Sequence, residues 1–279
     1  LHLDIKQLEM ALNNEDGFKS LLSFLSKLEE NVSVVVDAKS PNHLDVLASA
    51  IKIISKEKKF LFRTAASFIN SLSGLKPNPK SSSDLVSLKS QNIDFEYKPG
   101  LIMVGSHVQL ATDQLNLLLK DDSCEGLEIP VSKLADIFAL EDCQQEILEL
   151  ECILLSKIHN ILDNKKIPVL YTTREEMEFS SHSIRMKFGL ELAEFMAILV
   201  GKITNKLGYI ISKGGITTQL LLQKGLNFNQ VILKGQILPG LSIVQSNSDK
   251  YELPVITFPG NLGNEKTLLE SFRLMEFDS

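Results

Sequence analysis

The sequence predicts an α/β protein of two domains, each built on a mostly parallel sheet flanked by helices. Two observations favour this fold class. Short β-branched or apolar runs alternate with segments whose apolar residues recur every three or four positions, as strands and helices do around parallel sheets. The 279 residues, 44% of them hydrophobic, are enough to bury one large or two modest cores. A ligand site is therefore expected at the carboxyl ends of the strands and in the cleft between the domains.

The N-terminal part predicts two strand and helix pairs. The β-branched residues 32–36 indicate a strand that ends at Asp37, and residues 44–54 carry the apolar spacing of a helix. Residues 60–62 indicate a second buried strand, followed by a helix with Thr64 as its N-cap. These elements favour a parallel sheet in the first domain.

The next segment, residues 75–85, loses periodicity and gathers Pro, Asn and Ser, which is typical of a connection between domains. We therefore assign residues 1–84 to the N-terminal domain and its linker, and residues 99–279 to the C-terminal domain. In the latter, strands are expected at 101–104, 127–131, 167–171, 209–212, 231–233 and 255–258. Helices are expected at 112–120, 147–161 and 188–203, after 218 to a left-handed cap at Gly225, and at 268–275.

Composition excludes several classes of protein. The net charge is −6 and the lysines are scattered, so the footprint of a nucleic-acid-binding protein is missing. The longest apolar runs are too short for a membrane-spanning helix. Three cysteines without a CxxC pair and five histidines without HxH or HxxxH spacing argue against a disulfide framework and a metal site. A cytoplasmic location is the expectation.

Three loops share one design, in which a strand runs into glycine and a helix follows. They span residues 105–107, 214–217 and 260–263. Glycine lets a phosphate approach backbone N–H groups, and a helix N-terminus supplies unpaired donors with a partial positive charge. Because all three loops follow parallel strands, we expect them to meet at one site. Thr217 could cap a helix or bind phosphate, and Lys213 adds a cation beside the second loop.

Each of these residues also has a purely structural interpretation. Glycine is common in short connections, Ser106 is a suitable helix cap, His107 fits an exposed loop, and Lys213 fits a solvated strand end. Asp37 and Arg63 are candidate ligand contacts, but Asp also forms turns and Arg also forms salt bridges. The charged run that begins at Arg174 is expected to be solvated.

The known nucleotide motifs narrow the choice of enzyme class. Neither GxGxxG nor the Walker pattern GxxxxGK[ST] occurs in the chain, so a dinucleotide-binding fold and a P-loop enzyme both lose support. A dehydrogenase is the least favoured alternative.

Five segments, in this order and spacing, resemble the four-carbon acid sugar kinase family, formerly a domain of unknown function; they are residues 62–68, 104–107, 213–217, 235–240 and 258–263. The resemblance implies a two-domain ATP-dependent kinase that phosphorylates small acid sugars such as threonate, erythronate or 3-oxo-tetronate, and Mg²⁺ is expected with the ATP. By the same resemblance, residues 99–279 are the nucleotide-binding domain and residues 1–84 the remaining part of the substrate-binding domain with its linker. The residues that match ATP-contacting positions are Ser106, Gly214, Gly215, Ile216, Thr217 and Gly260. Lys213 and Gly263 are expected as further phosphate contacts, and Asp37 and Arg63 as substrate contacts.

The chain departs from the family pattern in three respects. Ile216 stands where a better-described branch has an acidic residue, and Phe258 begins a segment that there reads Lys-Ser-Gly-Asn-Phe-Gly. The Asp-Asp-Phe-Thr-Gly-Ala motif of the substrate domain is absent, and the sequence does not begin with Met, so we expect a fragment whose catalytic groups lie outside it. A non-catalytic nucleotide- or metabolite-binding module, or another reaction on a phosphorylated ligand, remain alternatives. A homodimer is also an expectation.

Overall fold

The computed structural model describes residues 1–75, 79–174, 177–247 and 253–276. The chain divides into two compact units, Leu1–Pro77 and Asn78–Ser279. This division falls inside the segment 75–85, for which the sequence predicts a connection. The residues just after it belong to the second unit, where the Lys80 N–H donates to the carbonyl oxygen of Gln236 at 2.8 Å.

The first unit consists of four helices and a two-stranded parallel sheet. In chain order its elements are β1 (His2–Leu3), α1 (Ile5–Asn13), α2 (Glu15–Ser26), β2 (Val35–Val36), α3 (Pro41–Ile54) and α4 (Ala66–Ser73). The apolar faces of α1, α2 and α3 bury a common core, in which Leu8 and Ala50 are fully buried. The predicted helix over residues 44–54 is thus found within α3.

Two predictions in the first unit were wrong. Residues 60–62 form no strand: Phe60 and Phe62 contact each other and Phe62 packs on Phe68, while Leu61 is fully exposed. A buried strand needs neighbouring strands, and within the described residues this unit offers only β1 and β2. Helix α4 begins later than expected, with Ala65 at its N-cap, so Thr64 does not cap it.

The second unit contains a seven-stranded sheet in the order β4-β5-β3-β6-β9-β8-β7. The first five strands in this order are parallel, whereas β8 runs antiparallel to β9 and β7. Their bounds are β3 (Gly100–Val104), β4 (Cys124–Ile129), β5 (Ile167–Thr172), β6 (Tyr209–Lys213), β7 (Val231–Leu238), β8 (Leu241–Ser246) and β9 (Val255–Phe258). The predicted fold class is confirmed.

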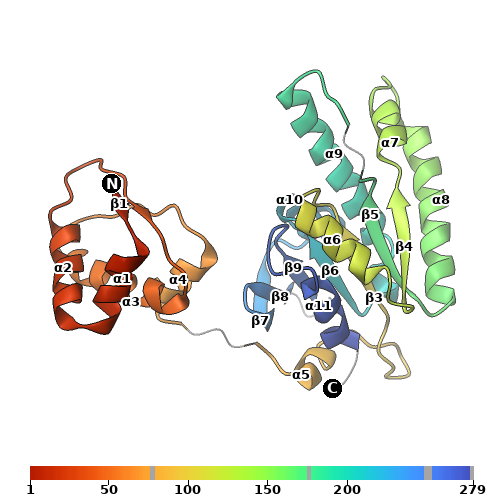
Figure 1. The fold of residues 1–279 in the computed structure, drawn as a ribbon. Helices are drawn as coiled ribbons and strands as arrows, with labels where there is room; N and C mark the ends of the chain where they lie inside the picture. The colour runs from red at the N-terminus through yellow and green to blue at the C-terminus, as the bar shows by residue number, and fades with distance from the viewer. Residues whose placement is uncertain (76–78, 175–176, 248–252, 277–279) are drawn as a thin grey trace. The chain divides into compact units, whose positions relative to one another are not determined.

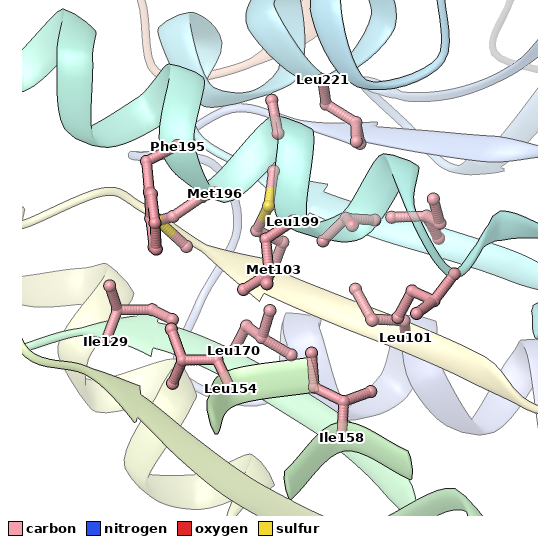
Figure 2. Close-up of a cluster of buried hydrophobic side chains, with 14 of the residues drawn as sticks. Leu101, Met103, Ile129, Leu154, Ile158, Leu170, Phe195, Met196, Leu199 and Leu221 are labelled. Carbon is pink, nitrogen blue, oxygen red and sulfur yellow. The ribbon is translucent and has the colours of Figure 1, made fainter. Parts of the chain in front are cut away.

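Helices cover both faces of this sheet (Figure 1). One face buries side chains of α7 (Val131–Phe138), α8 (Gln144–Asp163), α9 (His182–Gly201) and the π-helical turn η2 (Leu221–Gly225), which continues α10 (Gly215–Leu220). The other face packs against α5 (Ser82–Val86), α6 (Gln109–Leu118) and α11 (Thr267–Glu276); a 3₁₀ turn, η1 (Thr204–Lys206), precedes β6. Figure 2 shows the first core, where Met103 and Leu170 of the sheet lie among side chains of α8 and α9.

In the second unit the sequence missed α5, α7 and β8 and misjudged Gly225. Gly225 has no positive φ, so it is not a left-handed cap. A methyl group there would come within 2.3 Å of the Ala197 carbonyl oxygen, so glycine is needed because η2 approaches α9 closely. Among the described residues, no helix has the length and apolar character needed to cross a membrane.

Candidate functional site

The three glycine loops meet at the carboxyl ends of β3, β6 and β9, which are neighbours in the sheet. The Gly105 N–H donates to the carbonyl oxygen of Lys213 at 3.1 Å, and the Gly214 N–H donates to that of Phe258 at 2.9 Å. The structure therefore brings together the loops that the sequence expected to converge. Their positions at adjacent strand ends follow from the parallel pairing of the three strands.

Close packing explains two of the glycines, and backbone conformation explains a third. A methyl group at Gly105 would lie 2.2 Å from Thr217 Oγ1, and one at Gly260 would lie 2.5 Å from Ser106 Oγ. Gly214 has φ +127°, a backbone conformation that side chains disfavour. These glycines are needed for the loops to touch one another, whatever ligand they bind.

Gly215 has no such explanation. It is the first residue of α10 and has no positive φ, and a methyl group at this position would meet no atom within 4 Å. Alanine would fit there and would favour the helix by up to about 1 kcal/mol. The open space beside the Gly215 Cα is therefore available to a ligand.

Two hydroxyl groups lie among the three loops: Ser106 Oγ is close to Gly260, and Thr217 Oγ1 is close to Gly105 and Gly214. Ser106 is not a helix cap, because the N-cap of α6 is Val108, and Thr217 does not cap α10. Within the described residues, neither hydroxyl group forms a hydrogen bond. Thr218 differs, because its Oγ1 donates to the carbonyl oxygen of Ser212 at 3.0 Å and packs the helix onto β6.

Lys213 is fully buried, so its interpretation as a solvated strand end was wrong. Its Nζ lies 3.9 Å from the centroid of the Phe258 ring and donates to the carbonyl oxygens of Pro259 and Gly260. Burial lowers the pKa of Lys213 to about 8. The amine lies beneath the loop, and this geometry gives no support to the direct phosphate contact that the sequence suggested.

Arg174 is a second cation at the strand ends, and sequence reasoning missed it. It is half-buried rather than solvated, and it donates to the carbonyl oxygens of Ser106 at 2.5 Å and Val104 at 3.1 Å. Its Nε is buried without a partner among the described residues. Burial lowers the pKa of Arg174, although Tyr171 and Glu128 act in the opposite direction. Its position two residues after β5, at the carboxyl end of a parallel strand, is the sequence signal that could have identified it.

Replacing Arg174 by Met should lower the free energy of unfolding by about 2 kcal/mol, because two carbonyl oxygens lose their charged donor. The matched control is Arg185→Met, which removes the same charge from an exposed position of α9. We expect the control to change stability by less than about 0.5 kcal/mol. Chemical denaturation of both variants measures the difference, and equal stability would contradict the role assigned to Arg174.

The other candidates in the second unit lie around the same loops. Ile216 is 53% exposed, and His107 is exposed with its Nε2 3.0 Å from Thr172 Oγ1. Gly263 has φ +84°, and a methyl group there would lie 2.3 Å from Thr267 Oγ1, so glycine is structurally required. The surroundings of these three residues do not test whether they contact a ligand, so their predicted roles stay predictions.

The candidates in the first unit show ordinary surroundings. Asp37 Oδ2 lies 2.8 Å from His2 Nε2, and both side chains are exposed. Arg63 is exposed and forms no ion pair with the residues that the structure describes. Their predicted contact with substrate stays a prediction.

Metal ligands and cavities do not point to a second site at the strand ends. In the described ranges, no group of three or more His, Cys, Asp or Glu side chains is placed to hold a metal ion. A small apolar cavity lies in the first unit between α1 and α2, and an open hollow lies between β4 and α8. Anion binding at the loops would depend on backbone donors, hydroxyl groups and the positive charges of Lys213 and Arg174.

Residues 101–268 match the family described as the nucleotide-binding C-terminal domain. The match confirms the C-terminal domain that the sequence resemblance implies. No protein of curated function is detectably similar in sequence.

Three solved structures share the fold. The first is a domain of unknown function from Bordetella bronchiseptica, a domain-swapped dimer with bound citrate. It is 14% identical, with a TM-score of 0.51, and the match covers 98% of this chain and 58% of that protein. A Salmonella typhimurium LT2 protein with a provisional tRNA synthase name is 13% identical, with a TM-score of 0.57. The match covers 97% of this chain and 59% of that protein. A Haemophilus influenzae protein is 17% identical, with a TM-score of 0.50. The match covers 98% of this chain and 60% of that protein. This chain thus spans about three fifths of the length of each.

Proposed function

This chain belongs to the family of nucleotide-binding C-terminal domains, and from that premise we propose that its second unit binds ATP·Mg²⁺ at the ends of β3, β6 and β9. The phosphates would contact the Gly214–Thr217 loop, including Ile216, together with Ser106 and Gly260. Glycine-rich turns that precede a helix supply the backbone donors that phosphates need.

The observation that carries this proposal is Gly215. Its backbone conformation and its packing would both accept alanine, and glycine at the start of a helix lowers helix stability. Gly215 follows a buried parallel strand at the edge where ligands of such sheets bind, and a glycine there that costs stability and answers no structural need is best explained by a ligand that approaches its Cα. The hydroxyl groups of Ser106 and Thr217 lie among the same three loops, with Ser106 Oγ against Gly260 and Thr217 Oγ1 against Gly105 and Gly214.

We further propose that the whole protein is a kinase that transfers a phosphoryl group to a four-carbon acid sugar of the threonate, erythronate or 3-oxo-tetronate type. The sequence resemblance supports this reaction, and positioned backbone donors suit the loose transition state of phosphoryl transfer. The Bordetella bronchiseptica neighbour binds citrate, which is a small polycarboxylate. The first unit, as the end of a substrate domain with Asp37 and Arg63, is part of the same proposal.

The residues at the strand ends are compatible with Mg²⁺ that arrives bound to the nucleotide. Mg²⁺ commonly keeps phosphate oxygens and water as ligands and needs few protein carboxylates. Hydroxyl groups such as that of Thr217 could complete its coordination. The ion would neutralise negative charge on the phosphates.

A non-catalytic nucleotide-binding module is the second candidate. Ile216, an exposed apolar residue where a related branch carries an acidic one, is the observation that favours it. Full-length protein that binds ATP tightly but turns over none of a panel of four-carbon acids would favour the module over the kinase.

Calorimetric titration with ATP and Mg²⁺ tests the binding site through Gly215→Ala. We expect affinity to fall about tenfold, equivalent to about 1.4 kcal/mol, because the methyl group occupies the space of the phosphates. Gly189→Ala is the matched control, since Gly189 lies in a helix with no atom within 4 Å of an added methyl group. Equal affinity of both variants and the parent would remove the Gly214–Thr217 loop from the site.

A further inference from the structure

The loop of residues 259–264, which joins β9 to α11, is held from beneath by Lys213. Its Nζ donates to the carbonyl oxygens of Pro259 and Gly260 at 3.2 and 3.1 Å. The side chain is fully buried and forms no ion pair with any residue that the structure describes. A buried, unpaired charge is costly, and an apolar side chain of similar size would fill the same space at lower cost.

Gln114 of α6 holds the other half of the same loop. Its Nε2 donates to the carbonyl oxygens of Leu262 at 3.1 Å and Asn264 at 2.6 Å, and the residue is fully buried. Two carbonyl oxygens require the NH₂ group rather than Oε1 to face them, which fixes the orientation of the amide. Gln114 Oε1 is buried without a partner within the described part of the chain.

These contacts determine where the peptide N–H groups of the loop point. A trans peptide is planar, with its C=O and N–H on opposite sides, so each carbonyl turned inward leaves the next residue's N–H turned outward. The four N–H groups concerned form no hydrogen bond within the described residues. They belong to Gly260, Asn261, Gly263 and Glu265.

We propose that Lys213 and Gln114 are positioning residues, which hold these four carbonyl groups inward so that a row of peptide N–H groups faces the phosphates of the ligand. The inference rests on the proposed function and assigns to it two residues that do not touch the ligand. The positive charge of Lys213 beneath the row adds attraction for an anion. Arg174 holds the carbonyl groups of Val104, at the end of β3, and of Ser106, in the next loop, in a similar way.

Hydrogen–deuterium exchange of the parent protein is the first test. With ATP·Mg²⁺ bound, we expect slower exchange both in residues 213–219 and in residues 258–266. Slower exchange in 213–219 alone would overturn the inference and the Gly260 contact, while ATP binding at the Gly214–Thr217 loop would stand. Absence of ATP binding would instead count against the proposed function.

Titration with inorganic triphosphate separates positioning from folding. We expect Lys213→Met and Gln114→Met each to weaken triphosphate binding at least about tenfold and to abolish the slower exchange of residues 258–266. In the parent and in Gln114→Met, affinity should also fall as pH rises above about 8, because Lys213 loses its charge there. Burial alone accounts for that pKa, with the Phe258 ring and two carbonyl groups as its neighbours.

Lys213→Met should lack this pH dependence. If Lys213 only supported the fold, the variant would keep the pH dependence of the parent. Parent-like affinity of either variant, or the same pH profile in Lys213→Met and Gln114→Met, would overturn the proposal.

Discussion

Gly105→Ala is expected to lower the free energy of unfolding by about 3 kcal/mol, near the upper end for overpacking a tight contact. The added methyl group would lie 2.2 Å from Thr217 Oγ1, a distance that real Cβ contacts do not reach. Gly105 is also fixed by the bond from its N–H to the carbonyl oxygen of Lys213, so the backbone has little room to move. Denaturant unfolding at neutral pH measures the loss.

A double-mutant cycle identifies the cause of that loss. Thr217→Ala removes Oγ1 and Cγ2, the two atoms nearest to the new methyl group, so Gly105→Ala should cost much less in that background. Gly215→Ala serves as the control, because the same substitution there meets no atom. If Gly105→Ala cost the same free energy with and without Thr217, the contact between the first two loops would be wrong.

The second large effect is a dependence of stability on pH that arises from Lys213. Burial lowers its pKa from 10.5 to about 8 in the folded protein. Between these values the unfolded chain binds a proton that the folded chain has released, so the free energy of unfolding rises with pH across this window. The full difference corresponds to about 3 kcal/mol, with the penalty complete below about pH 8.

Lys213→Met isolates this contribution. Burial raises the pKa of Cys124 from 9.0 to about 12, which lowers stability as pH rises across that range in the parent and the variant alike. The difference between the two proteins cancels the effect of Cys124. Urea denaturation at several values of pH from 7 to 10 should show the parent gaining stability relative to Lys213→Met, and a constant difference would show that Lys213 titrates normally.

Much of the second unit could be predicted from the sequence. The runs at 101–104, 209–212 and 255–258 are mostly β-branched or apolar and are followed by glycine within two residues, and all three are buried parallel strands. Burial on both faces of a parallel sheet requires such runs, so local composition is sufficient to identify them. The predicted convergence of the three loops followed from the same geometry.

Local patterns failed where a residue's neighbours come from elsewhere in the chain. Residues 60–62 are apolar like a buried strand, but pairing partners decide whether a strand forms. Gly225 resembled a cap, although its role is set by the approach of α9. The helix α7 was missed because the predicted strand was extended to residue 131, past Pro130, which is the N-cap of α7.

The candidate site divides in the same way. The sequence by itself determined the alternation of strands and helices, and the three glycine loops that end neighbouring strands. Only the tertiary structure decided that Gly215 faces open space and that Lys213 lies under a loop. It also decided the role of Gln114, which holds carbonyl groups 148 and 150 residues away. Such contacts join distant segments, and the spacing of residues along a chain carries no information about which buried donor will meet which carbonyl group.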